Sequence, residues 1–471
     1  MRRWSVDDVR THGAVGDGRT LDHAAFQRAI NQCSVRGGGI VVVPPGRYRC
    51  GSIKLKGGVH LHIQAGAEIF GSPDEADYEC VVPSCHGVFP TTTRALFHAD
   101  EEDDIAITGY GSIHGGGDSP MPGPLYLATC FRPAVFLLRG CCRVRIADLT
   151  IKDSRYWTIH LLRCCDVRVR GITISNHRQR ISSVGLVADS SRDVLVSDCV
   201  IESGDDAVAV KSTVDLPCSN IAVTNCILRS SQAALKIGAQ SVGTISNVLF
   251  SNCIIEGSHV GIGVYMKDGG LFENLSFIDL VISADSEFPI TIDATARRHA
   301  RDTDPGHMRD LRFSGLTVHG RGRCYVQGHP LAPIERLTMR DVVWTVHGYC
   351  DGPKAVKNRG SEHVDPQPGG VDLAAEPWHF VFAHIAGLRM ADISCHLAVP
   401  LQRHDRGLLL LDHVSDAAFA DLRGLPTPPG LPAVEVRGCS DLHGLSSALR
   451  TGAAVVSGLE SGLMHAAVRG A

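Results

Sequence analysis

Short runs of alternating apolar and polar residues recur along most of the chain at a fixed interval. Five of these runs have an apolar residue at their second position, and these positions, 167, 194, 221, 248 and 275, are 27 residues apart. Alternation with a period of two, interrupted by Asn, Asp, Ser or Gly, predicts strands and turns rather than helices. A unit of this length cannot bury its own apolar face, so successive units must stack.

Stacked units of this kind predict an all-β parallel solenoid with coils about 4.8 Å apart. Equivalent positions of successive coils then form columns along the axis. Cys199, Cys226 and Cys253 fall in one such column. Thiols that face inward in a column would explain much of the cysteine content without a redox role.

The N-terminal end has a different pattern. From Thr20 to Cys33, apolar residues have helical spacing behind an N-cap-like threonine. We expect a helix that caps the first coil, because an open solenoid end exposes apolar surface. The predicted organisation is a single domain over residues 1–471, divided into a cap region (1–45), coils (46–349), a polar loop excursion rich in Gly and Pro (350–375) and C-terminal coils (376–471).

Composition narrows the classes of partner. The net charge is −4 without long charge runs, which disfavours nucleic acid and anionic membranes as partners. No apolar stretch of about 18 residues is present, and the N-terminal segment has no apolar signal core. We therefore expect no membrane span and a cytoplasmic location, unless a leader has been removed. The sequence does not indicate the oligomeric state.

Cysteine spacing bears on metals and redox state. The chain has 17 cysteines, and pairs such as Cys141–Cys142 and Cys164–Cys165 are adjacent rather than spaced as in zinc sites. We expect reduced, buried thiols. No metal and no cofactor is predicted.

Two adjacent carboxylates are the main chemical signal. Asp205 and Asp206 stand in ESGDDAVAVKS, where a turn ends and a buried strand begins. Aligning the strands by their small apolar residues places Lys236 and Tyr265 on an outward face beside this turn, with His259 in a neighbouring column. A carboxylate pair in a polar groove suits glycoside hydrolysis, in which one carboxyl protonates the leaving oxygen and the other activates water.

Plainer explanations exist for each of these residues. A Gly-Asp-Asp turn is common in surface loops, Lys236 fits a solvated side chain, and His259 fits a turn cap. Asp189 and Lys211 fall one rung apart in the same column, which favours a structural ion pair. His160 alternates with inward residues and also fits a structural role.

Several segments resemble the polygalacturonase family, glycoside hydrolase family 28. They include THGAVGDGRTLDHAAFQRAIN, ESGDDAVAVKS and AALKIGAQSVGTISNVLFSNC followed by GIGVYMKDGG, and the resemblance extends over about residues 7 to 315. It implies a right-handed parallel β-helix and inverting hydrolysis of pectin-type chains. It also implies that Asp205 is the general acid and that Asp206 is one of the carboxylates that hold the attacking water.

The chain departs from the family pattern at three places. Val184 stands where the family has an Asp one coil earlier, and Ala233 stands where it has a His. The family's Arg-Ile-Lys motif, which binds the galacturonate carboxylate, becomes residues 263–265, Gly-Val-Tyr. Lys236, about 4.8 Å from Gly263 by the coil spacing, is a candidate replacement cation, and Lys267 lies nearby in sequence.

The leading hypothesis is an inverting glycoside hydrolase that acts on pectin-type or other acidic or rare-sugar oligosaccharides. Asp205 would be the acid and Asp206 the base, with Lys236, His259, Tyr265 and Lys267 as substrate-binding residues. Loops at 117–133 and 350–375 would favour exo action by blocking one end of the groove.

Two alternatives remain open. One is a non-catalytic carbohydrate-binding β-helix that has kept the scaffold and lost the chemistry. The other is a polysaccharide lyase with Lys236 or His259 as the base, near a cation or bound Ca²⁺.

Overall fold

The computed structural model describes residues 5–83, 92–117, 131–180, 182–284, 288–295, 305–348, 376–398, 406–423, 432–449 and 456–457. The chain divides into two compact units, Met1–Ser231 (unit 1) and Gln232–Ala471 (unit 2). The predicted loop excursion at 350–375 lies outside the described residues, and the single-domain organisation stays a prediction.

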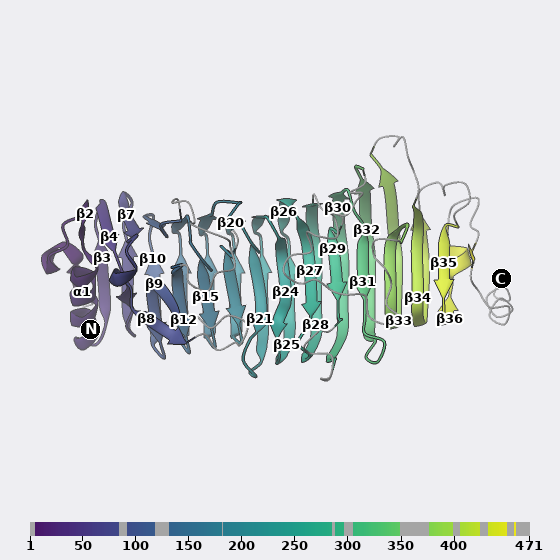
Figure 1. Cartoon of the computed structure of the whole chain (residues 1–471), viewed down its shortest axis with the longest axis horizontal. Coiled ribbons are helices and arrows are strands. Elements are labelled where there is room, and N and C mark those ends of the chain that lie inside the picture. The colour runs from purple at the N-terminus through teal and green to yellow at the C-terminus, as the bar shows by residue number, and fades with distance from the viewer. Residues whose placement is uncertain are drawn as a thin grey trace. The chain divides into compact units, whose positions relative to one another are not determined.

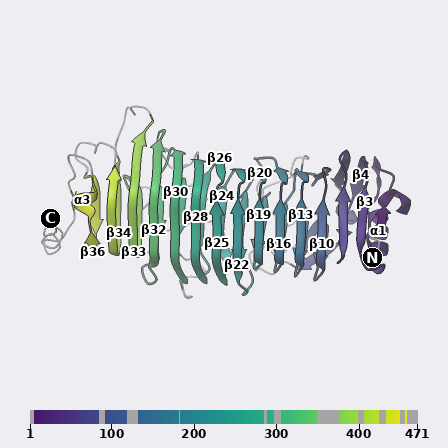
Figure 2. The ribbon, with the colours of Figure 1, turned by 180° about the vertical axis from the view of Figure 1, so that it is seen from behind.

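Unit 1 is built mainly from parallel strands (Figures 1 and 2), and their pairing defines three ladders. The first ladder contains β1 (Ser5–Asp8), β3 (Gly39–Val43), β6 (Val59–Ile63), β10 (Asp103–Thr108), β13 (Cys142–Ala147), β16 (Cys165–Arg170), β19 (Arg192–Ser197) and β22 (Cys218–Thr224). The second contains β2 (Asp17–Leu21), β4 (Gly46–Cys50), β7 (Ala67–Gly71), β11 (Ser112–His114), β14 (Thr150–Lys152), β17 (Thr173–Ser175), β20 (Val200–Ser203) and β23 (Ile227–Ser230). The third contains β5 (Ile53–Lys54), β9 (Thr92–Asp100), β12 (Ala134–Arg139), β15 (Ile159–Leu162), β18 (Leu186–Asp189) and β21 (Val208–Ser212).

Three short elements complete unit 1 beside the N-terminal helix. They are β8 (Cys80–Pro83), which pairs antiparallel with β9, and the 3₁₀ turns Val9–His12 and Glu75–Asp77.

Unit 2 is also built from parallel strands, several of which are longer than those of unit 1. One ladder contains β24 (Ala233–Ser241), β27 (Val260–Met266), β29 (Ile290–Asp293), β31 (Cys324–Gln327), β33 (Trp378–Leu397), β34 (Gly407–Arg423), β35 (Val434–Arg437) and β37 (Val456–Ser457). The others contain β25 (Thr244–Ser251), β26 (Ile254–Ser258), β28 (Leu271–Ala284), β30 (His307–Gly320), β32 (Ile334–Val346) and β36 (Ser440–His443), together with β33 and β34, which turn a corner and join a second ladder. A short helix, α3 (Leu445–Ala448), follows β36.

The 27-residue period of the sequence is the length of one coil. Within unit 1, Asp193 and Asn220 both have φ of 57° at equivalent corners; within unit 2, Asn247 and Asn274 have φ of 54° and 57°. Asn and Asp tolerate this left-handed conformation better than other residues with side chains. The Asn220 amide donates to Asp193 Oδ1 at 2.8 Å, and Asn274 donates to Asn247 Oδ1 at 2.7 Å. Left-handed Asn and Asp residues, and the hydrogen bonds between their side chains, therefore stabilise the corners between strands that the repeat predicted.

A helix caps the first coil as predicted, but it begins later than expected. The helix α1 (His23–Val35) buries Phe26 and Ile30 and contacts β1, β3, β5 and β6 (Figure 1). Thr20 lies in β2, so its assignment as the N-cap was wrong, and Asp22 holds that position. The Asp22 carboxylate accepts hydrogen bonds from two backbone N–H groups of the preceding loop instead of capping the helix.

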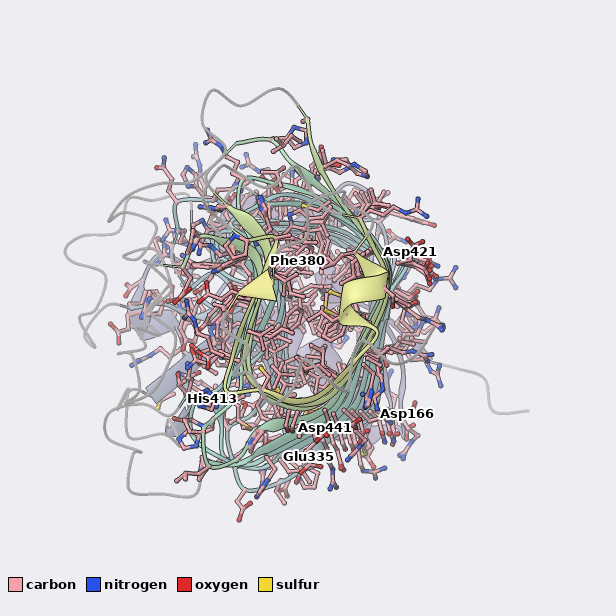
Figure 3. All side chains as sticks on the ribbon, turned by 90° about the vertical axis from the view of Figure 1, so that its right-hand side faces the viewer. Asp166, Glu335, Phe380, His413, Asp421 and Asp441 are labelled. Carbon is pink, nitrogen blue, oxygen red and sulfur yellow. A yellow bond between two sulfur atoms is a disulfide. The ribbon has the colours of Figure 1, made fainter. Side chains whose placement is uncertain are left out.

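Apolar side chains fill the inside of the coils. In unit 2, Phe380 is 1% exposed and points inward, whereas Glu335, Asp421 and Asp441 lie on the outer surface (Figure 3). Together with the parallel ladders, this confirms the right-handed parallel β-helix fold class for both units. None of the described helices is long and apolar enough to cross a membrane.

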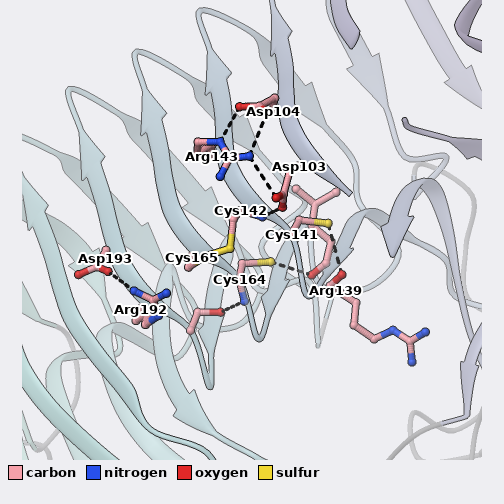
Figure 4. Close-up of a disulfide and its surroundings, with 12 residues drawn as sticks. Asp103, Asp104, Arg139, Cys141, Cys142, Arg143, Cys164, Cys165, Arg192 and Asp193 are labelled. Atoms are coloured by element: carbon pink, nitrogen blue, oxygen red, sulfur yellow. Dashed lines mark hydrogen bonds and ion pairs between the residues drawn. A yellow bond between two sulfur atoms is a disulfide. The ribbon is translucent and has the colours of Figure 1, made fainter. Parts of the chain in front are cut away.

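Most cysteines in the described part of the chain are buried free thiols; Cys80 is exposed, and two others form a disulfide. Cys199 and Cys226 form the predicted inward column in unit 1, where their mutual hydrogen bond, followed by burial, raises the pKa of Cys199. The expectation of reduced thiols is wrong for Cys142 and Cys165, which form a disulfide between β13 and β16 (Figure 4). These two residues are direct register partners, so their side chains meet on the same face of the ladder.

Candidate active site

The Asp205 turn, residues 204–207, connects β20 to β21 in unit 1. A side chain at Gly204 would place its Cβ 2.2 Å from the backbone oxygen of Arg180, so only glycine fits there. The Gly204 N–H donates to Ser183 Oγ at 3.2 Å. The turn is therefore packed tightly against the preceding coil.

The two aspartates have different environments. Asp205 is partly exposed, and its carboxylate accepts the backbone N–H groups of Ser182 at 2.9 Å and Asp206 at 3.0 Å. Asp206 is only 3% exposed, and its backbone oxygen accepts the Gly185 N–H at 3.0 Å. The Asp205 side chain is therefore partly accessible to solvent, whereas the Asp206 side chain is almost completely buried.

Val184, at the position of the missing family carboxylate, lies in an apolar cluster. It packs with Val187 and Ala209, and Trp157 covers the cluster from outside. Val187 and Ala209 are register partners, and both are fully buried although they face away from the coil interior. The outward face next to the Asp205 turn is therefore lined by buried apolar side chains and forms an apolar wall.

An aromatic pair lies beside this wall. The rings of Tyr156 and Trp157 are parallel within 3° at 5.4 Å. The Arg132 guanidinium lies 5.3 Å from the Tyr156 ring, and Lys211 Nζ lies 5.5 Å from the Trp157 ring. Burial raises the pKa of the Tyr156 phenol; Arg132 opposes the rise and the Asp205 carboxylate adds to it, which places Tyr156 near the candidate acid.

This aromatic pair was missed in the sequence. The available signal was the dipeptide Tyr156-Trp157 in the turn before β15. The Asp205 turn precedes β21, another strand of the same ladder, so both turns lie on the same side of unit 1.

Asp189 is the centre of a buried polar group. Its carboxylate accepts the backbone N–H of Thr213 at 2.9 Å and its hydroxyl at 2.6 Å, and it lies 3.2 Å from His160 Nε2. Burial raises the pKa of Asp189, but the hydrogen bonds from His160 and Thr213 outweigh burial and leave the pKa below its usual value. Asp189 and Lys211 are register partners as predicted, and an ion pair between them stays a prediction.

In unit 2, Lys236 and Tyr265 lie together. Lys236 Nζ is 5.6 Å from the Tyr265 ring, a cation–π distance. Lys236 is the register partner of Gly263, as the column alignment predicted. A Cβ at Gly263 would lie 2.5 Å from the Tyr265 ring, so the glycine allows this ring to lie across the strand toward Lys236.

Lys267 and His259 complete the predicted residues of unit 2. Lys267 is 2% exposed; its Nζ lies 2.6 Å from Asp293 Oδ2 and donates to Thr295 Oγ1 at 3.0 Å. His259 is partly exposed in the bend between β26 and β27. Substrate binding by either residue stays a prediction, and the buried ion pair gives Lys267 a structural role in addition.

The predicted site residues fall in different units. Asp205 and Asp206 belong to unit 1, whereas Lys236, His259, Tyr265 and Lys267 belong to unit 2. Their meeting on a shared wall stays a prediction.

Comparison with known proteins gives the family. The sequence model for glycosyl hydrolases family 28 matches residues 33–359. A probable polygalacturonase of Vitis vinifera is 29% identical over 220 residues, which are 43% of this chain and 43% of that protein. An exo-poly-alpha-D-galacturonosidase of Dickeya chrysanthemi is 32% identical over 120 residues, 24% of this chain and 20% of that protein. The match thus spans less than half the length of these curated relatives.

A solved structure has the same fold. The hyperthermoactive exopolygalacturonase of Thermotoga maritima superposes with a TM-score of 0.64 at 24% identity, covering 73% of this chain and 87% of that one. The family match spans well over half of the sequence and agrees with this fold. The chain therefore belongs to glycoside hydrolase family 28.

Proposed function

We propose that this protein is a glycoside hydrolase that cleaves pectin-type, galacturonate-containing chains with inversion at the anomeric carbon. The observation that carries the proposal is the Asp205 turn, which holds two carboxylates next to the Tyr156–Trp157 pair. The names of the relatives from Vitis vinifera and Dickeya chrysanthemi support a galacturonan as the substrate.

The proposed reaction uses the two carboxylates in turn. Protonated Asp205 gives its proton to the glycosidic oxygen as the bond to the anomeric carbon breaks. Asp206 takes a proton from the water that attacks this carbon from the opposite face. The products are a sugar with inverted configuration and an alcohol, so atoms and charges balance. Trp157 offers an apolar surface for a sugar ring beside the carboxylates.

An acidic substrate also needs a cation for its carboxylate. We assign this role to Lys236, a partly exposed residue whose ammonium group lies over the Tyr265 ring. Lys267 also fixes Asp293 through their buried ion pair, in addition to its predicted role in substrate binding. The name of the Dickeya chrysanthemi relative supports exo action. Most of the predicted loop at 117–133 and all of the loop at 350–375 lie outside the described residues.

A non-catalytic carbohydrate-binding protein is the second candidate. The observation that favours it is the apolar cluster around Val184, which leaves the family's additional carboxylate without a counterpart there. In that case the protein would bind the same chains and leave them intact.

Release of reducing ends from polygalacturonate and other pectic oligosaccharides tests the proposal. Asp205→Asn and Asp206→Asn should each abolish release but retain binding. Asp198→Asn is a matched control, because Asp198 is an exposed aspartate at a corner with φ of 57°, which Asn tolerates. Binding without release by the unaltered protein would support the second candidate, and an unsaturated product that absorbs in the ultraviolet would indicate a lyase instead.

A further inference from the structure

A pocket of about 240 Å³ opens in unit 1, on the N-terminal side of the Asp205 turn. It lies where β7, β11 and β14 end. The residues that matter for its chemistry are Phe70, His114, Gly116, Asp153 and Arg155. None of them belongs to the catalytic groups proposed above.

One wall of the pocket is an aromatic pair. Phe70 and His114 are register partners on β7 and β11, and their rings stack at 4.5 Å with an angle of 17°. The Arg47 guanidinium lies 4.9 Å from the centre of the Phe70 ring. Residues held by strand pairing and ring stacking form a rigid surface, which lowers the entropic cost of binding a ligand.

The Arg155 guanidinium group also belongs to the lining of the pocket. Arg155 Nε donates to the backbone oxygen of Gly116 at 2.6 Å, and the guanidinium carbon lies 5.4 Å from the Phe131 ring. A Cβ at Gly116 would lie 3.3 Å from Arg155 Nη2, and the φ of Gly116 is 76°, so this glycine makes room for the arginine. Within the described ranges, Arg155 forms no ion pair with a carboxylate. Its charge is therefore available to an acidic ligand.

The pocket lies on the side of unit 1 that carries the Asp205 turn. Lys152, Ser175 and Glu202 are successive register partners, so Asp153 and the residue before Gly204 occupy equivalent places two coils apart, about 10 Å along the axis. Arg155 is also directly followed by Tyr156, which lies near Asp205. A short oligosaccharide spans such a distance.

We propose that this pocket is a distal subsite that binds one uronate residue of the chain whose glycosidic bond lies at Asp205. The Arg155 guanidinium pairs with the uronate carboxylate, in the two-point geometry that arginine favours. Asp153 accepts a sugar hydroxyl, and the Phe70–His114 wall contacts the apolar face of the ring. This assignment rests on the proposed function, because it takes the substrate to be acidic.

Titration calorimetry with galacturonate oligomers tests the subsite. We would measure hexagalacturonate and digalacturonate binding to Asp205→Asn protein, so that turnover does not interfere, and then add Arg155→Gln or His114→Ala. Arg155→Gln should weaken hexamer binding about tenfold or more, as expected for loss of a charge-assisted contact, and leave dimer binding within about twofold. Arg168→Gln, an exposed arginine outside the pocket, is the matched control and should change neither.

Three comparisons decide the result. Arg155→Lys should recover part of the hexamer affinity. A methyl-esterified hexamer should bind the parent Asp205→Asn protein equally well with and without Arg155→Gln, which excludes a folding defect as the cause. The subsite would be overturned if Arg155→Gln left the hexamer affinity of Asp205→Asn protein unchanged. It would also be overturned if Asp205→Asn protein did not bind the hexamer at all. If Arg155→Gln weakens hexamer binding but the unaltered protein never releases reducing ends, the proposed hydrolysis fails and the subsite stands. If the unaltered protein releases reducing ends but Arg155→Gln leaves hexamer binding unchanged, the subsite fails and the proposed hydrolysis stands.

Discussion

Lys267 Nζ lies 2.6 Å from the Asp293 carboxylate, and both side chains are almost completely buried. Breaking such a pair by removing one partner leaves an uncompensated charge in the interior. We therefore expect Lys267→Met to lower the free energy of unfolding of the protein by about 3–5 kcal/mol, measured by chemical denaturation.

A matched double variant distinguishes this structural role from substrate binding. Lys267→Met combined with Asp293→Leu removes both charges and should recover much of the lost stability. If Lys267 instead binds substrate alone, Lys267→Met would raise KM and leave the unfolding curve unchanged.

Val184→Asp would restore the carboxylate type that the family has at this place. Because Val184 packs with Trp157, Val187 and Ala209, the new charge would be desolvated. We expect unfolding at lower denaturant concentration, with a loss of about 2 kcal/mol or more, and no gain in turnover. Val184→Ala controls for the lost volume. A gain in reducing-end release by Val184→Asp would show that the apolar cluster is dispensable.

The buried carboxylate of Asp189 should make the free energy of unfolding depend on pH in the acidic range. Its pKa is lowered in the folded protein, so its stabilising contribution is complete above the unfolded value of about 3.9 and is lost as the pH falls through the folded pKa. We expect the free energy of unfolding of the unaltered protein to fall on acidification below about pH 4 more steeply than that of Asp189→Asn. Parallel pH profiles for the two proteins would contradict this account.

Gly204→Ala should disrupt the Asp205 turn. The added Cβ would lie 2.2 Å from the Arg180 backbone oxygen, which cannot move without shifting the preceding coil. We expect a loss of stability of about 1–3 kcal/mol together with a large loss of turnover. Thermal unfolding and reducing-end release check the two effects, and normal values for both would show that the turn tolerates a side chain.

The coil length and the strand register could be predicted from the sequence for a physical reason. Each coil repeats the same corner, and Asn or Asp at positions such as Asn220 and Asn247 marks it, because these residues tolerate left-handed backbone. The alternation of side chains along a strand then fixes which residues face inward, so the pairing of Lys236 with Gly263 could be predicted.

The contacts around the site could not be predicted in the same way. Trp157 belongs to an irregular turn, and nothing in the repeat indicates that its ring covers Val184. The partner of Lys267 lies beyond the last regular repeat, where the 27-residue spacing ends, so Asp293 could not be placed by counting. The Cys142–Cys165 disulfide depends on a coil of a different length, 23 residues.

The proton chemistry assigned to Asp205 and Asp206 is tested most directly by the configuration of the first product. Proton NMR during cleavage of an α-linked galacturonate oligomer should show the β-anomer at the new reducing end before mutarotation. Appearance of the α-anomer first, or an unchanged rate in Asp205→Asn protein, would contradict single displacement by water at this carboxylate pair.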